Sequence, residues 1–266
     1  MERPSHDTPR SDSLRGLAGA RRFLAHRSCL RALSQATRRS PPWYPSGTVT
    51  EALTAPIKPR LRGVSHQFAC LVSALLGIAL MAAVPTGEVR RAVLVYTLSL
   101  ATLFGVSAAY HRPTWQPRAR QWMRRLDHAA IFVLIAGTYT PLCLGLPLAE
   151  ASSLRTFVWT GALLGVLQSL LWVTAPKPLI AVLYVALGWS IAPYVTTVHR
   201  AVGAAPLALI LVGGVVYSAG AVVYAKKRPD PSPAVFGYHE VFHALVIVAA
   251  VLHFAAVALI ALAARR

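Results

Sequence analysis

Seven stretches of the 266-residue chain contain no Asp, Glu, Lys or Arg, and each is close to the length of a membrane-spanning helix. A spanning helix needs about 20 apolar residues, because the hydrocarbon core of a bilayer is about 30 Å thick. The stretches are Phe68–Val84, Ala92–Tyr110, Ala129–Leu148, Thr156–Ala175, Leu179–Val198, Ala204–Ala225 and Ala244–Ala264. Only 14% of the residues are charged, which disfavours a soluble helical core. The sequence therefore predicts an all-α integral membrane protein, a seven-transmembrane helix bundle.

The Lys and Arg residues between the stretches predict how the bundle is oriented. If the N-terminus is cytoplasmic, the cytoplasmic loops hold nine basic residues and the opposite loops hold four. Basic residues accumulate in cytoplasmic loops, so we expect the N-terminus inside, the C-terminus outside, and location in the cell (plasma) membrane. The net charge of +18 then indicates attraction to anionic lipid and no nucleic-acid partner.

Residues 1–60 differ in composition from the rest of the chain. They are rich in Arg, Ser and Pro and lack sustained apolar periodicity. This composition predicts a disordered, basic cytoplasmic tail that precedes a membrane domain over residues 61–266. The alternative is that Leu14 to Leu33 form a basic amphipathic helix on the inner membrane face.

Polar residues cluster at the cytoplasmic ends of three of the predicted spans. Ser107 and His111 end the second span, Asp127 precedes the third, and His239 and His243 precede the seventh. Residues four apart share a helix face, and three imidazoles with an open position are a common ligand set for catalytic zinc. We therefore predict a Zn²⁺ site formed by the three histidines. Asp127 is the expected general base or water-holding group, and Ser107 is expected to orient His111 or donate to a substrate oxygen.

The segment 239–243 also matches the H-E-x-x-H pattern of zinc metalloproteases, in which the glutamate is the general base. No later acidic segment supplies a third ligand of the usual kind, so an intramembrane metalloprotease ranks third among the functions considered. The alternative role of Glu240 is a favourable charge in the first turn of a helix. The other histidines near the spans are interpreted as packed or interfacial residues: His66, His128, His199 and His253.

Four ordered motifs resemble the hemolysin III family. They span residues 107–111, 125–131, 136–141 and 237–243. That family belongs with the progestin and adipoQ receptors, in a wider group of membrane hydrolases that includes alkaline ceramidases. The resemblance covers about residues 58–264 and implies a seven-helix bundle with one zinc ion near the cytoplasmic leaflet.

One departure from the family pattern stands at the first span. Many members carry Glu and Asn or Thr seven and four residues before a histidine, where this chain has Pro59 and Arg62 before His66. The zinc ligand set that the resemblance implies is unaffected.

Two classes of function follow. The first is a zinc-dependent hydrolase of a lipid amide or ester, similar to ceramidase, with membrane lipid as its substrate. The alternative is a non-enzymatic protein with structural zinc, either membrane-permeabilising (a cytolysin) or receptor-like.

Overall fold

The computed structural model describes residues 58–264, so the expected N-terminal tail and the alternative amphipathic helix lie outside the described residues. Within this range the chain is helical apart from its connections and one isolated β-bridge. Seven helical segments are long and apolar enough to cross a membrane, which confirms the predicted fold class.

The elements of the bundle are α3 (Val64–Ala83), α4 (Glu88–His111), α5 (Pro117–Leu142), η1 (Cys143–Gly145), α6 (Leu148–Leu171), α7 (Lys177–Gly188), η2 (Trp189–Tyr194), α8 (Val195–Val202), α9 (Ala204–Lys226) and α10 (Tyr238–Ala263). Several helices begin in the charged flanks of the predicted stretches. The clearest case is α5, which starts at Pro117 because the fixed φ and missing N–H of proline suit the first helical position. Pro141, although inside the third charge-free stretch, lies in the last turn of α5, where the helix gives way to a 3₁₀ turn.

The fifth span is a broken helix, in which α7 passes through the 3₁₀ segment η2 into α8. The break frees backbone groups, and side chains from neighbouring spans satisfy some of them. The Tyr139 hydroxyl donates to the Gly188 carbonyl at 2.7 Å and accepts a hydrogen bond from the Ile191 N–H at 2.9 Å. Irregular backbone at membrane depth is tolerated where such partners exist.

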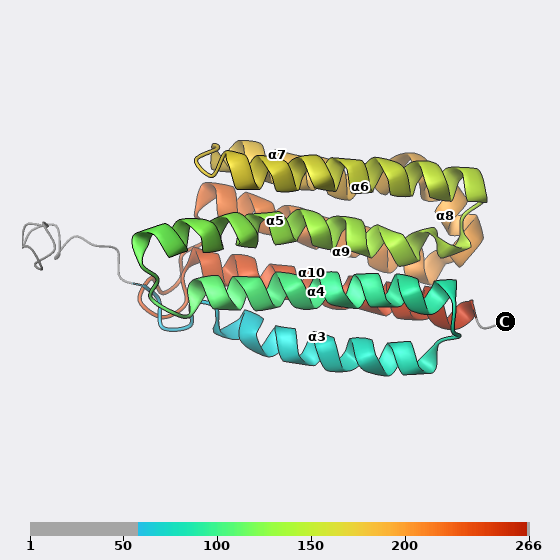
Figure 1. Cartoon of the computed structure of the whole chain (residues 1–266), viewed down its shortest axis with the longest axis horizontal. Coiled ribbons are helices and arrows are strands. Elements are labelled where there is room, and N and C mark those ends of the chain that lie inside the picture. Colours follow the sequence, from blue (N-terminus) through green and yellow to red (C-terminus); the bar gives the residue numbers. More distant parts are fainter. Residues whose placement is uncertain (1–57, 265–266) are drawn as a thin grey trace, which may run out of the picture. The chain divides into compact units, whose positions relative to one another are not determined.

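Consecutive helices pack as neighbours, most extensively α3 with α4, α4 with α5, α5 with α6, and α9 with α10 (Figure 1). Small residues allow the close approach. A side chain at Gly77 would collide with Thr97, and one at Gly165 would collide with the Phe132 ring. This is the usual packing of membrane helices, in which small residues line the contacts.

One end of every span lies at the same end of the bundle, which we call the site end. There α3, α5, α7 and α10 begin and α4, α6 and α9 end (Figure 1). Helix α10 contacts α3, α4, α5 and α9. The seven crossings leave the two ends of the described chain at opposite ends of the bundle (Figure 1). The side of the membrane that the site end faces stays a prediction from the basic loops.

Candidate metal centre

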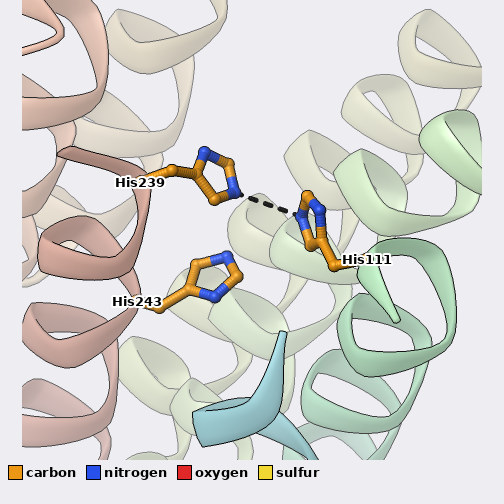
Figure 2. A group of neighbouring side chains, drawn as sticks. All are labelled: His111, His239 and His243. Carbon is orange, nitrogen blue, oxygen red and sulfur yellow. Dashed lines mark hydrogen bonds between the residues drawn. The ribbon is translucent and has the colours of Figure 1, made fainter. Parts of the chain in front are cut away.

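Three histidine side chains converge at the site end, as predicted. His111 is the last residue of α4, and His239 and His243 lie one turn apart at the start of α10. One ligand nitrogen from each ring can be chosen so that all three lie within 4.8 Å of one another. The Nε2 atoms of His111 and His239 are 3.1 Å apart (Figure 2). All three rings are buried, with His243 the deepest at 2% exposure.

This donor set fits a zinc ion. A tetrahedral ion with Zn–N bonds of about 2.0–2.1 Å holds neighbouring nitrogens roughly 3.4 Å apart, close to the separation between His111 and His239. Three buried imidazoles whose ring nitrogens converge from two helices are the arrangement expected of a metal-binding site (Figure 2). The residues present could hold a metal ion, and imidazole ligands alone do not define which one.

The start of α10, which fixes the two paired histidines, is anchored by Glu240. One carboxylate oxygen of Glu240 accepts a hydrogen bond from the Gly237 N–H at 2.9 Å, and the other is paired with the Arg62 guanidinium. Glu240 is buried, at 3% exposure. Its carboxylate is thus engaged in capping α10 and in an ion pair with the segment before α3. This arrangement supports the first-turn role of Glu240 and disfavours the general-base role that the H-E-x-x-H pattern assigns.

His66 belongs to the surroundings of this site in a way that the sequence reasoning missed. Its ring stacks on the His243 ring, with centroids 3.8 Å apart and planes 11° from parallel. It is 2% exposed, and neither ring nitrogen has a hydrogen-bond partner among the described residues. The sequence does contain a signal for this position of His66, because the predicted first span crosses the membrane in the same direction as the third and seventh. A histidine at its start should therefore reach the same end of the bundle.

Asp127 and Ser107 lie beside the histidines rather than among the converging ligand atoms. Both line a cavity of about 140 Å³ that His243 also lines. We call this the apolar cavity, because most of its wall is aliphatic and aromatic, including Leu103, Ile131, Leu134, Tyr139, Tyr184 and Val246. Ser107 is buried and Asp127 is partly exposed, as befits a residue on a cavity wall. The predicted roles of both residues stay predictions.

A second, larger cavity also borders Asp127. Its volume is about 580 Å³, and we call it the basic cavity from its lining residues Arg62, Arg120, Arg124 and Lys177. His111 and His239 line it, whereas His243 lines the apolar cavity. The three histidines therefore lie at the junction of an apolar and a charged space, and Asp127 borders both.

The remaining histidines do not join the converging ligand atoms. His253 lines the apolar cavity, and its Nε2 lies 3.1 Å from the Ile210 carbonyl oxygen, which supports the hydrogen-bonded structural role. His128 lines the basic cavity, and His199 is exposed on α8.

Lys58 lies among several other cations at the site end. Its ammonium donates to the carbonyl oxygen of Arg112 at 2.8 Å and reaches that of Pro113. Burial first, and then the nearby guanidinium groups of Arg112, Arg62 and Arg120, lower the pKa of Lys58. Cations at this end therefore act on one another.

The fold and the site define a class: multi-pass membrane proteins of seven helices with three histidines gathered at one end. Comparison with known proteins places the chain within it. The family model described as Haemolysin-III related matches residues 54–254, and the chain belongs to that family. The predicted resemblance is confirmed, and membership is consistent with location in the cell membrane.

Curated relatives agree with this assignment. The chain is 31% identical over 156 residues to the "Hemolysin-3 homolog" of Bacillus subtilis (strain 168), covering 58% of this chain and 69% of that protein. It is 30% identical over 135 residues to "Hemolysin-3" of Bacillus cereus, covering 50% and 61% respectively. It is also 28% identical over 174 residues to the human "Monocyte to macrophage differentiation factor", covering 61% and 67%.

Proposed function

We propose that the protein is a zinc-dependent hydrolase that cleaves an amide or ester bond of a membrane lipid. The observation that carries the proposal is the position of the three histidines at the junction of the two cavities, with Asp127 on the wall of both. A lipid bound there would have its apolar part in one cavity and its polar part in the other. The bond between the two parts would then lie beside the histidines and the carboxylate.

The residues divide the chemistry among them. His111, His239 and His243 would hold the ion, which when bound supplies a Lewis acid and makes water easier to deprotonate. The Asp127 carboxylate takes the proton of the attacking water and returns it to the departing amine or alcohol. Ser107, one turn before His111 on α4, supports the carboxylate or the substrate oxygen from the wall of the apolar cavity. The apolar wall limits access of bulk water, which strengthens these electrostatic interactions.

The alternative proposal is a non-enzymatic protein with structural zinc that permeabilises membranes or acts as a receptor. It is supported by the names of the two Bacillus relatives, hemolysin-3 and its homolog. In this case the histidines would contribute stability only, and Asp127 would have no catalytic role. Dye release from liposomes by the purified protein tests the permeabilising form, and an inert result counts against it.

Two measurements on the purified full-length protein test the hydrolase. The first is metal content, for which we expect about one zinc ion per chain in the wild type and much less in His111→Ala, because loss of one of three ligands weakens binding. The second is turnover of a lipid amide by Asp127→Asn, which should retain zinc and lose activity by about 10²- to 10⁴-fold.

Glu88→Gln is the matched control, since Glu88 is an exposed carboxylate at the opposite end of the bundle. It should keep wild-type turnover. Equal turnover in the wild type and Asp127→Asn would remove the enzymatic proposal. Zinc-free wild-type protein with full thermal stability would remove the metal site itself.

A further inference from the structure

The basic cavity carries more positive charge than the proposed hydrolysis needs. Four cationic side chains line it, Arg62, Arg120, Arg124 and Lys177, and Asp127 is the acidic residue on its wall. Arg62 is already paired with Glu240. The other three cations have no carboxylate within ion-pairing distance in the part of the chain that the structure describes.

Two of these unpaired cations are partly withdrawn from solvent. Arg124 and Lys177 are half-buried, whereas Arg120 is exposed at the mouth of the cavity. Removing a charge from water is unfavourable unless an opposite charge or hydrogen bonds compensate for it. Lys177 has partial compensation from the Tyr224 ring, whose centroid lies 5.0 Å from its ammonium nitrogen. Such an arrangement is favourable when an anion occupies the space between the cations.

The cations approach the cavity from two directions. Arg120 and Arg124 are four residues apart on α5 and therefore share a helix face, while Lys177 begins α7. Each guanidinium offers several N–H donors in a planar fork that matches the oxygens of a phosphate or carboxylate. Two forks and an ammonium provide more donors than one carboxylate accepts, which favours a phosphate-class group with three or more oxygens.

The two cavities share a wall, so an anion in the basic cavity lies beside the apolar cavity. Asp127, Ile131, Tyr184, Ala221 and Phe242 line both. A volume of about 580 Å³ lies within the range of roughly 300–1,000 Å³ typical of small-molecule sites. The apolar cavity, at about 140 Å³, is close to the engineered cavity of about 150 Å³ that binds benzene. Together they suit a molecule with a large anionic head and a short apolar section beside it.

We propose that the basic cavity binds the phosphate-class anionic headgroup of an amphiphile, held by Arg120, Arg124 and Lys177. If the bound amphiphile is the substrate, the proposal rests on the proposed hydrolase function, because the cleaved bond would then lie beside the histidines. As a statement about binding, it does not depend on catalysis or on a bound metal.

The test is a binding measurement on the full-length protein, purified in an uncharged detergent and stripped of metal with EDTA, because zinc itself attracts phosphate. The probe is dihexanoyl phosphatidic acid, with dihexanoylglycerol as the neutral amphiphile and glycerol 3-phosphate as the free anion. Isothermal titration calorimetry gives the affinities. We expect the phosphatidic acid to bind at least about tenfold more tightly than either comparison molecule, since charge-assisted hydrogen bonds contribute on that order.

The variant Arg124→Gln/Lys177→Gln should lower the affinity for phosphatidic acid by about tenfold or more, since it removes two of the three charged donors. Arg120→Gln, at an exposed position where folding is not at risk, should lower it by about threefold, in the range of a weak surface charge. Arg118→Gln is the matched control, because Arg118 is exposed on the same helix and does not line the basic cavity. It should bind as the wild type does.

Wild-type affinity in both Arg120→Gln and the double variant overturns the proposal. Equal affinity for glycerol 3-phosphate and phosphatidic acid also overturns it, since the ligand would then be a free anion. The hydrolase proposal fails in a different assay, in which Asp127→Asn shows the same turnover as the wild type. Loss of anion binding in the variants with no turnover of any lipid would support the binding site and remove the enzyme.

Discussion

The ion pair between Arg62 and Glu240 offers a test of how the start of α10 is held. In Arg62→Ala the Glu240 carboxylate, 3% exposed, keeps only its hydrogen bond from the Gly237 N–H. Breaking a buried ion pair by removing one partner costs about 3–5 kcal/mol, because an uncompensated charge remains. Arg62 is 19% exposed, so water can reach part of the vacated space, and we expect a loss near the lower limit, about 3 kcal/mol.

Glu240→Gln should be much milder. A glutamine carbonyl can still accept the hydrogen bond from Gly237, as in other helix caps. The Arg62 guanidinium loses its partner, but at 19% exposure it can turn toward water, whereas the charge left behind in Arg62→Ala is only 3% exposed. We expect a loss of about 1 kcal/mol, the usual contribution of one hydrogen bond. Combining Arg62→Ala with Glu240→Gln should be less destabilising than Arg62→Ala alone, with a coupling energy of about 1–3 kcal/mol.

The assay is reversible unfolding of the purified protein in mixed micelles, with an anionic detergent as denaturant and tryptophan fluorescence as the signal. The free energy of unfolding is compared among the wild type, both single variants and the double variant. A loss below about 1 kcal/mol in Arg62→Ala is the result expected of a surface pair. It would refute the claim that a buried ion pair holds the start of α10. Glu240→Gln with wild-type stability and no turnover of the lipid amide would instead assign to Glu240 the general-base role that the H-E-x-x-H pattern predicts.

Two further predictions concern packing and hydrogen bonding. Gly165→Ala would place a methyl group within 2.3 Å of a Phe132 ring atom, so we expect a loss of about 1–3 kcal/mol from overpacking in the same unfolding assay. Gly188→Ala, where nothing lies within 4 Å, is its control and should be within about 0.5 kcal/mol of the wild type. Tyr139→Phe removes the hydroxyl that bridges the Gly188 carbonyl and the Ile191 N–H, and the loss of these two hydrogen bonds should cost about 2 kcal/mol. A loss below about 0.5 kcal/mol in this last variant would show that the broken fifth span is held by other contacts.

The architecture of the membrane domain could be predicted because bilayer thickness imposes a length on every span. The charge-free stretches identify the seven spans, but they mark the hydrocarbon region and not the helix ends. Helix α5 begins at Pro117 and the predicted third stretch at Ala129, because arginine and glutamine continue a helix readily at the membrane surface. The 3₁₀ break in the fifth span was not predicted, although Gly188 and Pro193 stand inside that stretch.

The meeting of His111 with His239 and His243 could be predicted because the direction of each span fixes which of its ends lies at which membrane face. The topology predicts only the depth of each residue in the membrane. It does not give the rotation of each helix about its axis or the side-chain rotamers. The stacking of His66 on His243, and the pairing of Arg62 with Glu240 across 178 residues of sequence, depend on those quantities. The division of the histidines between two cavities depends on them as well.

The 3₁₀ segment η2 makes one wall of the apolar cavity easier to change by substitution than the others. Gly188, Trp189 and Ile191 form part of the wall of the apolar cavity, so this wall contains an irregular segment beside regular helix. A continuous helix shifts as a rod and disturbs every neighbour along its length, whereas an interrupted one can adjust a few torsion angles locally. Substitutions confined to residues 189–194 should therefore change the shape of the apolar cavity, while the histidines at the far end of the neighbouring helices keep their places.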